Sequence, residues 1–401
     1  MPSALWPGRT IGIMGGGQLG RMLAIEARRL GYRSCVLDPD PRSPAGQVAD
    51  SHIVGSLSDV AAARELARRV EVVTYEFENI HVDAVVAAEA LVPLYPGSAI
   101  LQITQDRIRE KETLVRLGLP VPKFAAVRSR EDLDDALRRI PLPLVMKTSS
   151  GGYDGKGQAV VSTPEEADVA FGRLTAHCDA LIVEEFVELA MDLSVICARG
   201  VDGQVACYPA SENQHRNGIL DVTLVPARVP LAVSALAKEL AVEIVQSLGL
   251  VGLLAVEMFL TSEGRLLINE LAPRPHNSGH YTLDACSTSQ FEQLVRVICQ
   301  LPLGATELYA PAAMVNLLGD LWSPEGQPNF PSALTVPGVR LYLYGKATAR
   351  PGRKMGHLCC VADSVDEALA RVLAARSGME QSHRQQPSAD SDGLSSRIAR
   401  D

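Results

Sequence analysis

Short apolar runs separated by glycine-rich and polar turns dominate the first hundred residues. The stretch "RTIGIMGGGQLGRMLAIEARRLGYRSCVLDPDP" begins with an apolar run, turns through glycines, continues with helical spacing from about Gln18 to Leu30, and ends in "SCVLD". A strand, helix and strand in this order are typical of a parallel sheet. Further apolar runs follow in "ADSHIVGSL", "VEVVTYEFENI" and "LVPLYPG". We therefore expect a Rossmann-like α/β domain over residues 9–103.

Beyond residue 103 the pattern mixes helices with paired strands. A hairpin is predicted at residues 201–203, and a turn at residues 262–264 joins the apolar runs "GLLAVEMFLT" and "GRLLINELA". These features predict an α+β domain followed by a small β-rich C-terminal domain. The polar, serine-rich end predicts a disordered tail. The expected divisions are 104–304, 305–376 and 377–401.

Composition and charge restrict the partners. The net charge is −9, from 38 basic and 47 acidic residues, and no basic run is interleaved with aromatic residues, so we expect no nucleic-acid partner. No apolar stretch approaches the roughly 20 residues that span a bilayer. The start has no signal-peptide core, so we expect a cytoplasmic protein without a membrane partner. Eight cysteines lack C-x-x-C spacing, and their apolar surroundings predict buried free thiols rather than disulfides or zinc ligands.

The first glycine run matches G-x-G-x-x-G. Gly15, Gly17 and Gly20 stand between a predicted strand and a helix, and Asp38 ends the next strand. In dinucleotide-binding folds such glycines let phosphate approach a helix N-terminus, while the acid binds ribose hydroxyls. Two hypotheses remain at this point: a nicotinamide or flavin cofactor, or a tight turn whose loop serves another ligand.

The second glycine run, "MKTSSGGYDGKGQAVV", is typical of a phosphate-binding loop. Its backbone N–H groups can surround an anion, and Lys147 and Lys156 supply positive charge. A glycine-rich hairpin with solvated lysines is the alternative interpretation.

Paired acids indicate a metal site further along the chain. Glu257 and Glu270 lie in apolar strands joined by a short turn, close to Asn269 and Asn277. Carboxylate and amide oxygens are hard ligands that suit Mg²⁺, although either acid could be a surface residue. The strand "LIVEEFV" ends in acids that can lie along an adenine, or is an ordinary strand end.

The combination of these motifs resembles the ATP-grasp superfamily. Their order is Lys147, "GGYDGKGQ", "EEFV", "ENQHRNGI", "VEMF" and "INELAPRPHNSGH". Within that superfamily, "IGIMGGGQLGRML", "TYEFENI" and "APRPHNSGHYTLDAC" are similar to the 5-(carboxyamino)imidazole ribonucleotide synthases, the ATPase subunits of phosphoribosylaminoimidazole carboxylase. The resemblance extends over residues 9–376. It implies ATP-dependent carboxylation of 5-aminoimidazole ribonucleotide with bicarbonate, through carboxyphosphate, in purine biosynthesis.

The resemblance also implies roles for individual residues. Those expected to contact ATP are Arg107, Lys147, Gly152, Tyr153, Asp154, Gly155, Lys156, Gly157, Gln158, Glu184, Glu185, Phe186, Val187, Asp192, His215, Asn269 and Glu270. Those expected to bind the ribonucleotide are Gly17, Gln18, Leu19, Glu76, Asn79, Tyr153, Lys346 and Arg353. Those expected to hold Mg²⁺ are Glu257, Glu270 and Asn277. Asp192 stands where the family has a glutamate, which puts the length of that ribose contact in doubt.

A carboxyphosphate mechanism assigns catalytic roles. Lys156 would stabilise the transferred phosphoryl group, Arg274 would hold bicarbonate, and Asp154 would accept a proton from the attacking amine. An acid beside phosphate is unfavourable, so we expect Tyr153 and Asp154 to face the aminoimidazole. The basic turn "YGKATARPGRKMGH" is either a solvated loop or the site for the 5′-phosphate.

Two other enzymes fit parts of the sequence. One is another ATP-grasp purine ligase, such as a formate-dependent glycinamide ribonucleotide transformylase, and the other is an NAD(P)-dependent dehydrogenase. The family resemblance further implies a homodimer.

Overall fold

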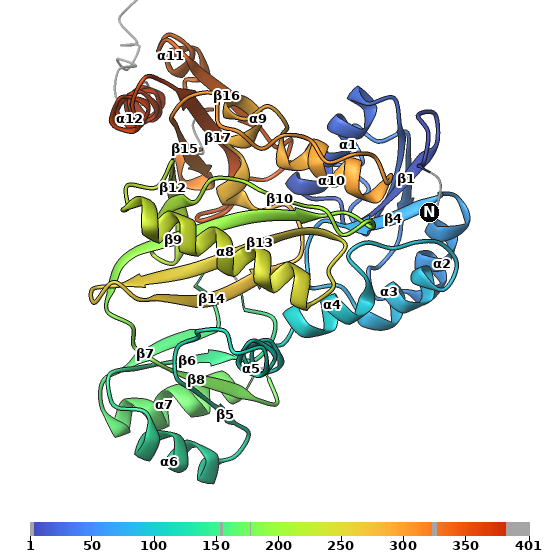
Figure 1. Cartoon of the computed structure of the whole chain (residues 1–401). Helices are drawn as coiled ribbons and strands as arrows, with labels where there is room; N and C mark the ends of the chain where they lie inside the picture. Colours follow the sequence, from blue (N-terminus) through green and yellow to red (C-terminus); the bar gives the residue numbers. More distant parts are fainter. Residues whose placement is uncertain (1–3, 153–154, 177, 323–326, 382–401) are drawn as a thin grey trace, which may run out of the picture.

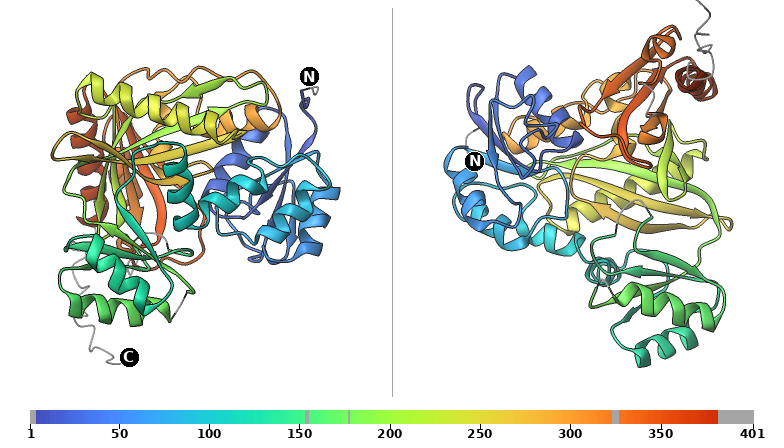
Figure 2. Two further views of the ribbon diagram at one scale, coloured as in Figure 1. Left: turned by 60° about the horizontal axis from the view of Figure 1, so that its bottom comes forward. Right: turned by 180° about the vertical axis from the view of Figure 1, so that it is seen from behind.

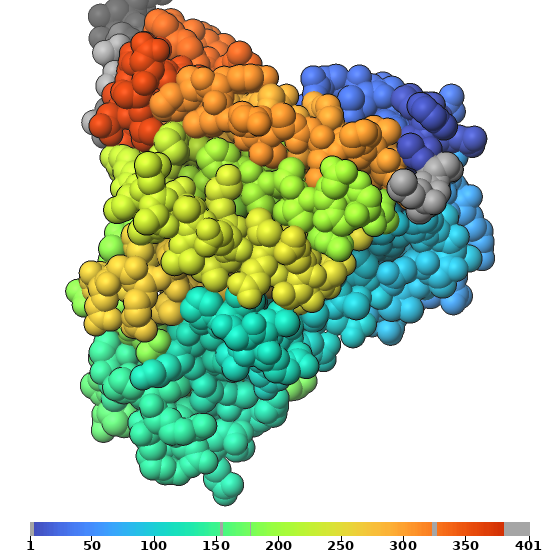
Figure 3. Space-filling view, in the orientation of Figure 1, coloured from blue at the N-terminus to red at the C-terminus, as the bar shows by residue number. Residues whose placement is uncertain are grey.

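The computed structural model of the chain describes residues 4–152, 155–176, 178–322 and 327–381. These residues form three β-sheets with helices packed around them (Figure 1). In both views of Figure 2 the N-terminal residues lie on one side of a large central sheet, and a smaller lobe lies below it. This lobe, coloured teal and green, projects from the rest of the molecule in the space-filling view (Figure 3). Tyr153 and Asp154 lie outside the described residues.

The N-terminal sheet has parallel strands in the order β3-β2-β1-β4. Their bounds are Thr10–Met14 for β1, Arg33–Asp38 for β2, Ser51–Val54 for β3 and Val72–Tyr75 for β4. Ile11 and Ile13 share a core with helix α1 (Gln18–Arg29), whereas Leu37 and Tyr75 share one with α2 (Val60–Arg68) and α3 (Val82–Glu89). Helices thus cover both faces, as parallel sheets require. The prediction of a Rossmann-like sheet is confirmed.

The second sheet is antiparallel, in the order β5-β8-β6-β7. Helices α4 (Ser98–Thr104) and α5 (Arg107–Arg116) precede it. Its elements are β5 (Phe124–Val127), α6 (Arg130–Arg139), β6 (Leu144–Thr148), β7 (Gln158–Val161), α7 (Pro164–Thr175) and β8 (Leu181–Glu185). Leu144 and Met146 share one core with both helices α6 and α7. Because strand side chains alternate, Lys147 lies on the opposite face of β6.

The third sheet has the order β14-β13-β9-β11-β12-β15-β17-β16, and β10 pairs with β9. The bounds are Leu189–Arg199 for β9, Val205–Cys207 for β10, Ser211–Arg216 for β11, Ile219–Val225 for β12, Gly252–Thr261 for β13, Leu266–Ala272 for β14, Ala312–Leu318 for β15, Val339–Leu343 for β16 and Lys354–Val361 for β17. Strand β15 pairs with β12, so the C-terminal strands extend the large sheet. The large sheet therefore combines strands from the middle of the chain with the C-terminal strands β15, β17 and β16.

The two faces of β9 and β13 differ in polarity. Leu193 and Val256 belong to the core beneath helix α8 (Leu231–Ser247), while the alternate residues Ser194 and Glu257 lie on the other face. Helix α10 (Gln290–Ile298) covers one end of that other face. The polar side chains remain at the other end, where a candidate site can form.

The remaining short elements are η1 (Asn277–Gly279), α9 (Thr282–Ala285), η2 (Gly319–Leu321) and α11 (Phe330–Leu334).

The C-terminal helix, α12 (Val365–Gln381), extends further than the sequence predicts. The prediction of a disordered tail from residue 377 is therefore wrong for residues 377–381. Met379 is fully buried in a core with Val372 and Ala375, and this spacing continues the helical pattern into the polar tail. Within the described ranges, no helix is long and apolar enough to cross a membrane.

One pair of cysteines is not free. Cys197 and Cys207 form a disulfide, so the prediction of free thiols is wrong for these two residues. Antiparallel pairing of β9 with β10 places them directly opposite each other, with their Cα atoms 4.2 Å apart. Only the hairpin register brings them together. The free cysteines are Cys35, Cys178, Cys286, Cys299, Cys359 and Cys360.

Candidate active site

Two predicted metal ligands meet on the polar face of the large sheet. Glu257 of β13 and Glu270 of β14 occupy directly opposite positions, and Ser194 of β9 lies on the other side of Glu257. Burial alone raises the pKa of Glu257, but the charge and hydrogen bond of His276 outweigh it and lower that pKa to about 2. Burial raises the pKa of Glu270, and the charge of Arg107 opposes this. At neutral pH Glu257 is therefore a carboxylate, and the imidazole of His276 lies against it.

The two carboxylates of Glu257 and Glu270 suit a cation whose other ligands are not protein side chains. Glu257 Oε1 lies 3.0 Å from His276 Nε2, and Glu270 Oε2 lies 3.5 Å from Arg107 Nη2. The side-chain amides of Asn277 and Asn316 bond each other reciprocally at 3.1 and 2.7 Å, which disfavours Asn277 as a third ligand. No group of three or more His, Cys, Asp or Glu among the described residues has metal-binding geometry. Two hard carboxylates suit Mg²⁺, which keeps waters and phosphate oxygens as its other ligands.

A buried carboxylate lies between two lysines behind these acids. Glu184, at the end of β8, has Oε2 2.5 Å from Lys147 Nζ and Oε1 3.4 Å from Lys111 Nζ. Lys111 is buried in α5 and also donates to the backbone carbonyls of Ile268 and Asn269, at 2.9 and 2.7 Å. The ammonium group thus joins the small sheet, α5 and β14. Lys147 also lies close enough to Glu270 for its charge to lower the pKa of that carboxyl.

The buried Glu184 makes the stability of the fold depend on pH in the acidic range. Burial alone raises its pKa, but the charges of Lys111 and Lys147 dominate and lower it from 4.5 to about 2. The folded protein therefore binds this proton less readily than the unfolded chain, and the stabilisation, complete above pH 4.5, is lost as pH falls towards 2. We expect urea unfolding between about pH 6 and pH 2 to show this loss. A Glu184→Gln variant should depend less steeply on pH in that window, and equal slopes would contradict the assignment.

The second glycine run approaches the site from β6 and β7. Arg107 Nη2 donates to the Gly152 carbonyl at 3.1 Å, and Thr148 N donates to the Gly157 carbonyl at 2.8 Å. Gly155 has a φ of +75°, and a Cβ there would lie 3.1 Å from the Cα of Gly218 in the β11–β12 turn. Glycine adopts this conformation without strain, and any larger residue would press against the backbone of Gly218. Gly155 thus lies against a hairpin of the large sheet.

Arg274 pairs with an acid in the segment that follows β4. Its guanidinium forms a bidentate pair with Glu78, in which Nε bonds Oε2 and Nη2 bonds Oε1 at 2.9 Å. Nη1 donates to the Pro275 carbonyl at 3.1 Å. Burial alone raises the pKa of Glu78, but the charge of Arg274 lowers it below its ordinary value. The pair joins the end of β4 to the segment after β14, and its role as the bicarbonate ligand stays a prediction.

The N-terminal glycine turn already holds a carboxylate. The side chain of Glu76 accepts the backbone N–H groups of Gly17 and Gly20, the latter at 2.7 Å, at the N-terminus of α1. Asp38 Oδ2 accepts the N–H of Gly16 at 2.7 Å. The positions that bind phosphate and ribose in dinucleotide folds are therefore taken by side chains of the chain itself. This geometry disfavours the dehydrogenase hypothesis.

The basic turn lies against this same part of the N-terminal domain. Gln47 Nε2 donates to the Gly345 carbonyl at 2.8 Å. Burial raises the pKa of Glu76, and the positive charge of Lys346 is close enough to oppose that rise. Lys346 Nζ donates to the Lys354 carbonyl at 2.6 Å, and Arg353 donates to the Thr348 carbonyl at 2.7 Å. The structure thus brings Lys346 near the glycine turn.

Comparison with known proteins gives a consistent result along the chain. The matching family models are a ribonucleotide synthetase preATP-grasp domain over residues 8–105, an ATP-grasp domain over residues 112–291, and a phosphoribosylaminoimidazole carboxylase C-terminal domain over residues 312–371. The chain is 46% identical over 369 residues to the N5-carboxyaminoimidazole ribonucleotide synthase of Bacillus subtilis (strain 168), covering 92% of this chain and 95% of that protein. The chain belongs to the N5-carboxyaminoimidazole ribonucleotide synthase family.

Solved structures of this family have the same fold. The Staphylococcus aureus N5-carboxyaminoimidazole synthetase complexed with ADP matches with a TM-score of 0.86 and 37% identity, covering 93% of this chain and 98% of that chain. The Aspergillus clavatus N5-carboxyaminoimidazole synthase in complex with ADP and 5-aminoimidazole ribonucleotide matches with a TM-score of 0.85 and 32% identity, covering 94% and 100%. The predicted family membership and fold class are confirmed.

Other residues that the family resemblance assigns to ATP lie around the same face. His215 Nδ1 is 3.1 Å from Oδ2 of Asp192, the position at which the resemblance implies a glutamate. Burial alone lowers the pKa of His215, but the hydrogen bond to Asp192 and the charge of Glu257 raise it. Asp192 therefore has the imidazole of His215 as a partner, besides the ATP ribose that it is predicted to bind. Beyond β8, Glu185 accepts the N–H of Lys123 at 2.9 Å, and Phe186 is exposed.

The other residues predicted to bind ATP or the ribonucleotide differ in how far their side chains are exposed to solvent. Leu19 is buried in the core of the N-terminal domain, so only its backbone remains for a ligand, while Gln18 is half-buried. Asn79, Lys156 and Gln158 are exposed, and Val187 is half-buried.

Sequence patterns missed several residues in ion pairs or hydrogen bonds around the candidate site. Lys111 is fully buried and pairs with Glu184, and the half-buried Glu78 pairs with Arg274, yet neither residue was predicted. Glu110, beside Lys111, is also buried: its Oε2 accepts the N–H of Leu271 at 3.1 Å, and burial together with the charge of Glu270 raises its pKa well above the ordinary value. One signal was present, because Lys111 and Leu114 follow at helical spacing on a face that starts at Arg107.

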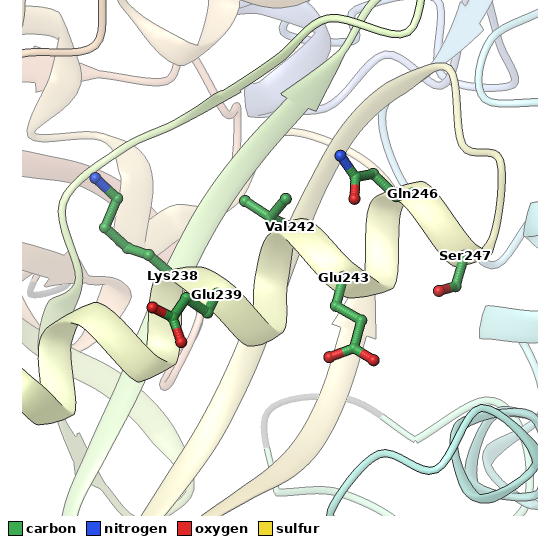
Figure 4. Close-up of a pocket in the computed structure, with 6 residues that line it drawn as sticks. All are labelled: Lys238, Glu239, Val242, Glu243, Gln246 and Ser247. Atoms are coloured by element: carbon green, nitrogen blue, oxygen red, sulfur yellow. The ribbon is translucent and has the colours of Figure 1, made fainter.

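A groove on the outer side of α8 is separate from this site. It is lined by Lys238, Glu239, Val242, Glu243, Gln246 and Ser247 (Figure 4). None of the predicted site residues borders it, and its charged side chains are ordinary for an exposed helix face. It therefore does not compete with the polar face of the sheet as the candidate site.

Proposed function

We propose that this protein carboxylates 5-aminoimidazole ribonucleotide with bicarbonate, using ATP and giving N5-carboxyaminoimidazole ribonucleotide, ADP and phosphate. The observation that carries the proposal is that Glu257 and Glu270 face each other on the large sheet, with Lys147 of the small sheet close enough for its charge to lower the pKa of Glu270. The chain also has this family's full domain order. The Aspergillus clavatus relative, whose complex contains ADP and 5-aminoimidazole ribonucleotide, supports both substrates.

The first chemical step follows from the charges of the site. A bicarbonate oxygen bonds to the γ-phosphorus of ATP, the bond to the β,γ-bridging oxygen breaks, and ADP leaves with carboxyphosphate formed. Lys147 and Lys156 supply positive charge for the transferred phosphoryl group. Glu257 and Glu270 would hold Mg²⁺, which neutralises phosphate charge when bound. The glycine-rich loop excludes water from the short-lived intermediate.

In the second step the exocyclic amine bonds to the carboxyl carbon, the bond to the phosphate oxygen breaks, and the amine loses a proton. We propose that Lys346 and Arg353 bind the 5′-phosphate, because Lys346 lies near the glycine turn at Gly17. The roles of Asp154 as proton acceptor and of Tyr153 in substrate binding stay proposals outside the described residues.

Steady-state ATP hydrolysis tests the function. We expect ADP release to require both 5-aminoimidazole ribonucleotide and bicarbonate, with one carboxylated product formed for each ATP consumed. Hydrolysis that instead depends on formate and glycinamide ribonucleotide would reject the proposal in favour of the transformylase. Binding of NAD(P)H without magnesium-dependent ATP binding would favour a dehydrogenase.

We also propose that the enzyme acts in the cytoplasm as a homodimer. The family resemblance supports both parts of this proposal. Sedimentation equilibrium at assay concentrations should give twice the mass of the 43.0 kDa chain, and a single-chain mass would reject the dimer.

A further inference from the structure

Gln290 is a fully buried amide next to the segment that follows β14. Its Oε1 accepts the backbone N–H of His276 at 2.9 Å, and its Nε2 donates to the His276 carbonyl at 2.8 Å. The same Nε2 lies 3.1 Å from Nδ1 of His280 and supplies its second hydrogen there. Both amide hydrogens and the amide oxygen are thus engaged, and two of these three bonds determine the backbone position of His276.

The side chain of His276 depends on that backbone position. Its Nδ1 accepts the N–H of Ser278 at 3.3 Å, so in the neutral ring Nε2 carries the proton and faces Glu257 at 3.0 Å. Ser278 Oγ contacts Nδ1 at 2.9 Å and Ser194 Oγ at 2.7 Å. A shift of the His276 backbone would therefore move the imidazole relative to Glu257.

Close packing holds the amide in place. A Cβ on Gly279 would lie 2.5 Å from Gln290 Oε1, so the backbone at Gly279 packs too closely against the amide for a larger residue. The backbone N–H of Gln290 donates to Thr282 Oγ1 at 2.9 Å. Helix α10, which Gln290 begins, packs against α1 and carries Glu292, the ion-pair partner of Arg29. The position of Gln290 is thus set by a rigid element between two domains.

We propose that Gln290 is a positioning residue for the carboxylation, acting through the backbone of His276 to set the distance between the imidazole and Glu257. The inference rests on the proposed function, because the reaction is its readout. Gln290 acts through His276 and is not itself a catalytic residue. Residues of this kind behind a metal-binding carboxylate typically change activity by about 10-fold to 100-fold.

The chain offers a matched control for this proposal. Gln293 is equally buried on the same helix, and its amide bonds the backbone of Gly304 in the same two-sided way, at 2.8 and 2.9 Å. Gly304 lies outside the candidate site. Gln290→Met and Gln293→Met therefore remove similar hydrogen bonds, but only the first is adjacent to His276.

Kinetics of both variants below their melting temperatures test the proposal. We expect Gln290→Met to lower kcat for carboxylation about 10-fold or more with KM for ATP unchanged, and Gln293→Met to keep the wild-type kcat. In a His276→Ala background, adding Gln290→Met should lower kcat no further. A wild-type kcat for Gln290→Met, or losses that multiply in the double variant, would overturn the inference.

Two further measurements separate this inference from folding defects and from the proposed function. Gln290→Glu keeps the acceptor for the His276 N–H in a side chain of the same shape, and we expect it to fold with a reduced kcat. Imidazole ¹H–¹⁵N spectra report the ring state of His276 without any assay, and we expect Gln290→Met, but not Gln293→Met, to change them. Unchanged His276 signals would overturn the inference, whereas failure of the proposed function would appear as an inactive wild type.

Discussion

A Lys111→Met variant is expected to have a free energy of unfolding about 3–5 kcal/mol lower than the wild type. Lys111 is 1% exposed, and its ammonium group bonds two carbonyls of β14 and the carboxylate of Glu184. Its removal leaves Glu184 buried with Lys147 as its remaining cation, and leaves the two carbonyls without this donor. The loss should therefore exceed that of an ordinary core substitution.

Urea unfolding monitored by circular dichroism measures the effect. Lys238→Met, on the exposed side of α8, is the matched control, and its stability should change by no more than about 0.5 kcal/mol. A Lys111→Met protein as stable as this control would show that the buried ammonium does not join the two sheets as described.

Glu270→Gln is expected to lower kcat for carboxylation by about 10²–10³-fold. The substitution keeps the shape of the side chain and removes its charge, which faces Glu257 across β13 and β14 and lies 3.5 Å from Arg107. Two carboxylates are the hard oxygen ligands that the proposed mechanism uses, so the loss of one charge weakens stabilisation of the transferred phosphoryl group.

Activity at several magnesium concentrations is the measurement. Glu263→Gln, in the exposed turn between the same two strands, should retain wild-type activity. If Glu270→Gln keeps most of its activity at every magnesium concentration, the two acids do not form the proposed site. Thermal unfolding of both variants separates a loss of fold from a loss of chemistry.

Much of the fold could be predicted from local pattern. The glycine turn at Gly15 to Gly20, the helix from Gln18, and the hairpin around residues 262–264 all depend on neighbours within a few residues. The boundary of the tail was wrong because α12 keeps burying residues such as Met379 after its composition turns polar. The pairing of Cys197 with Cys207 was missed because it depends on strand register rather than on spacing.

The sequence by itself determined the family, the parallel N-terminal sheet and the identity of the two acids that face each other on β13 and β14. Those features are encoded by turn chemistry, by alternation along strands and by motif order. Only the tertiary structure decided which charges neutralise one another: Arg274 with Glu78, 196 positions apart, and Glu184 with Lys111. Such pairs form where distant elements exclude water, and the strength of a buried charge contact depends on that enclosure, which no local pattern specifies.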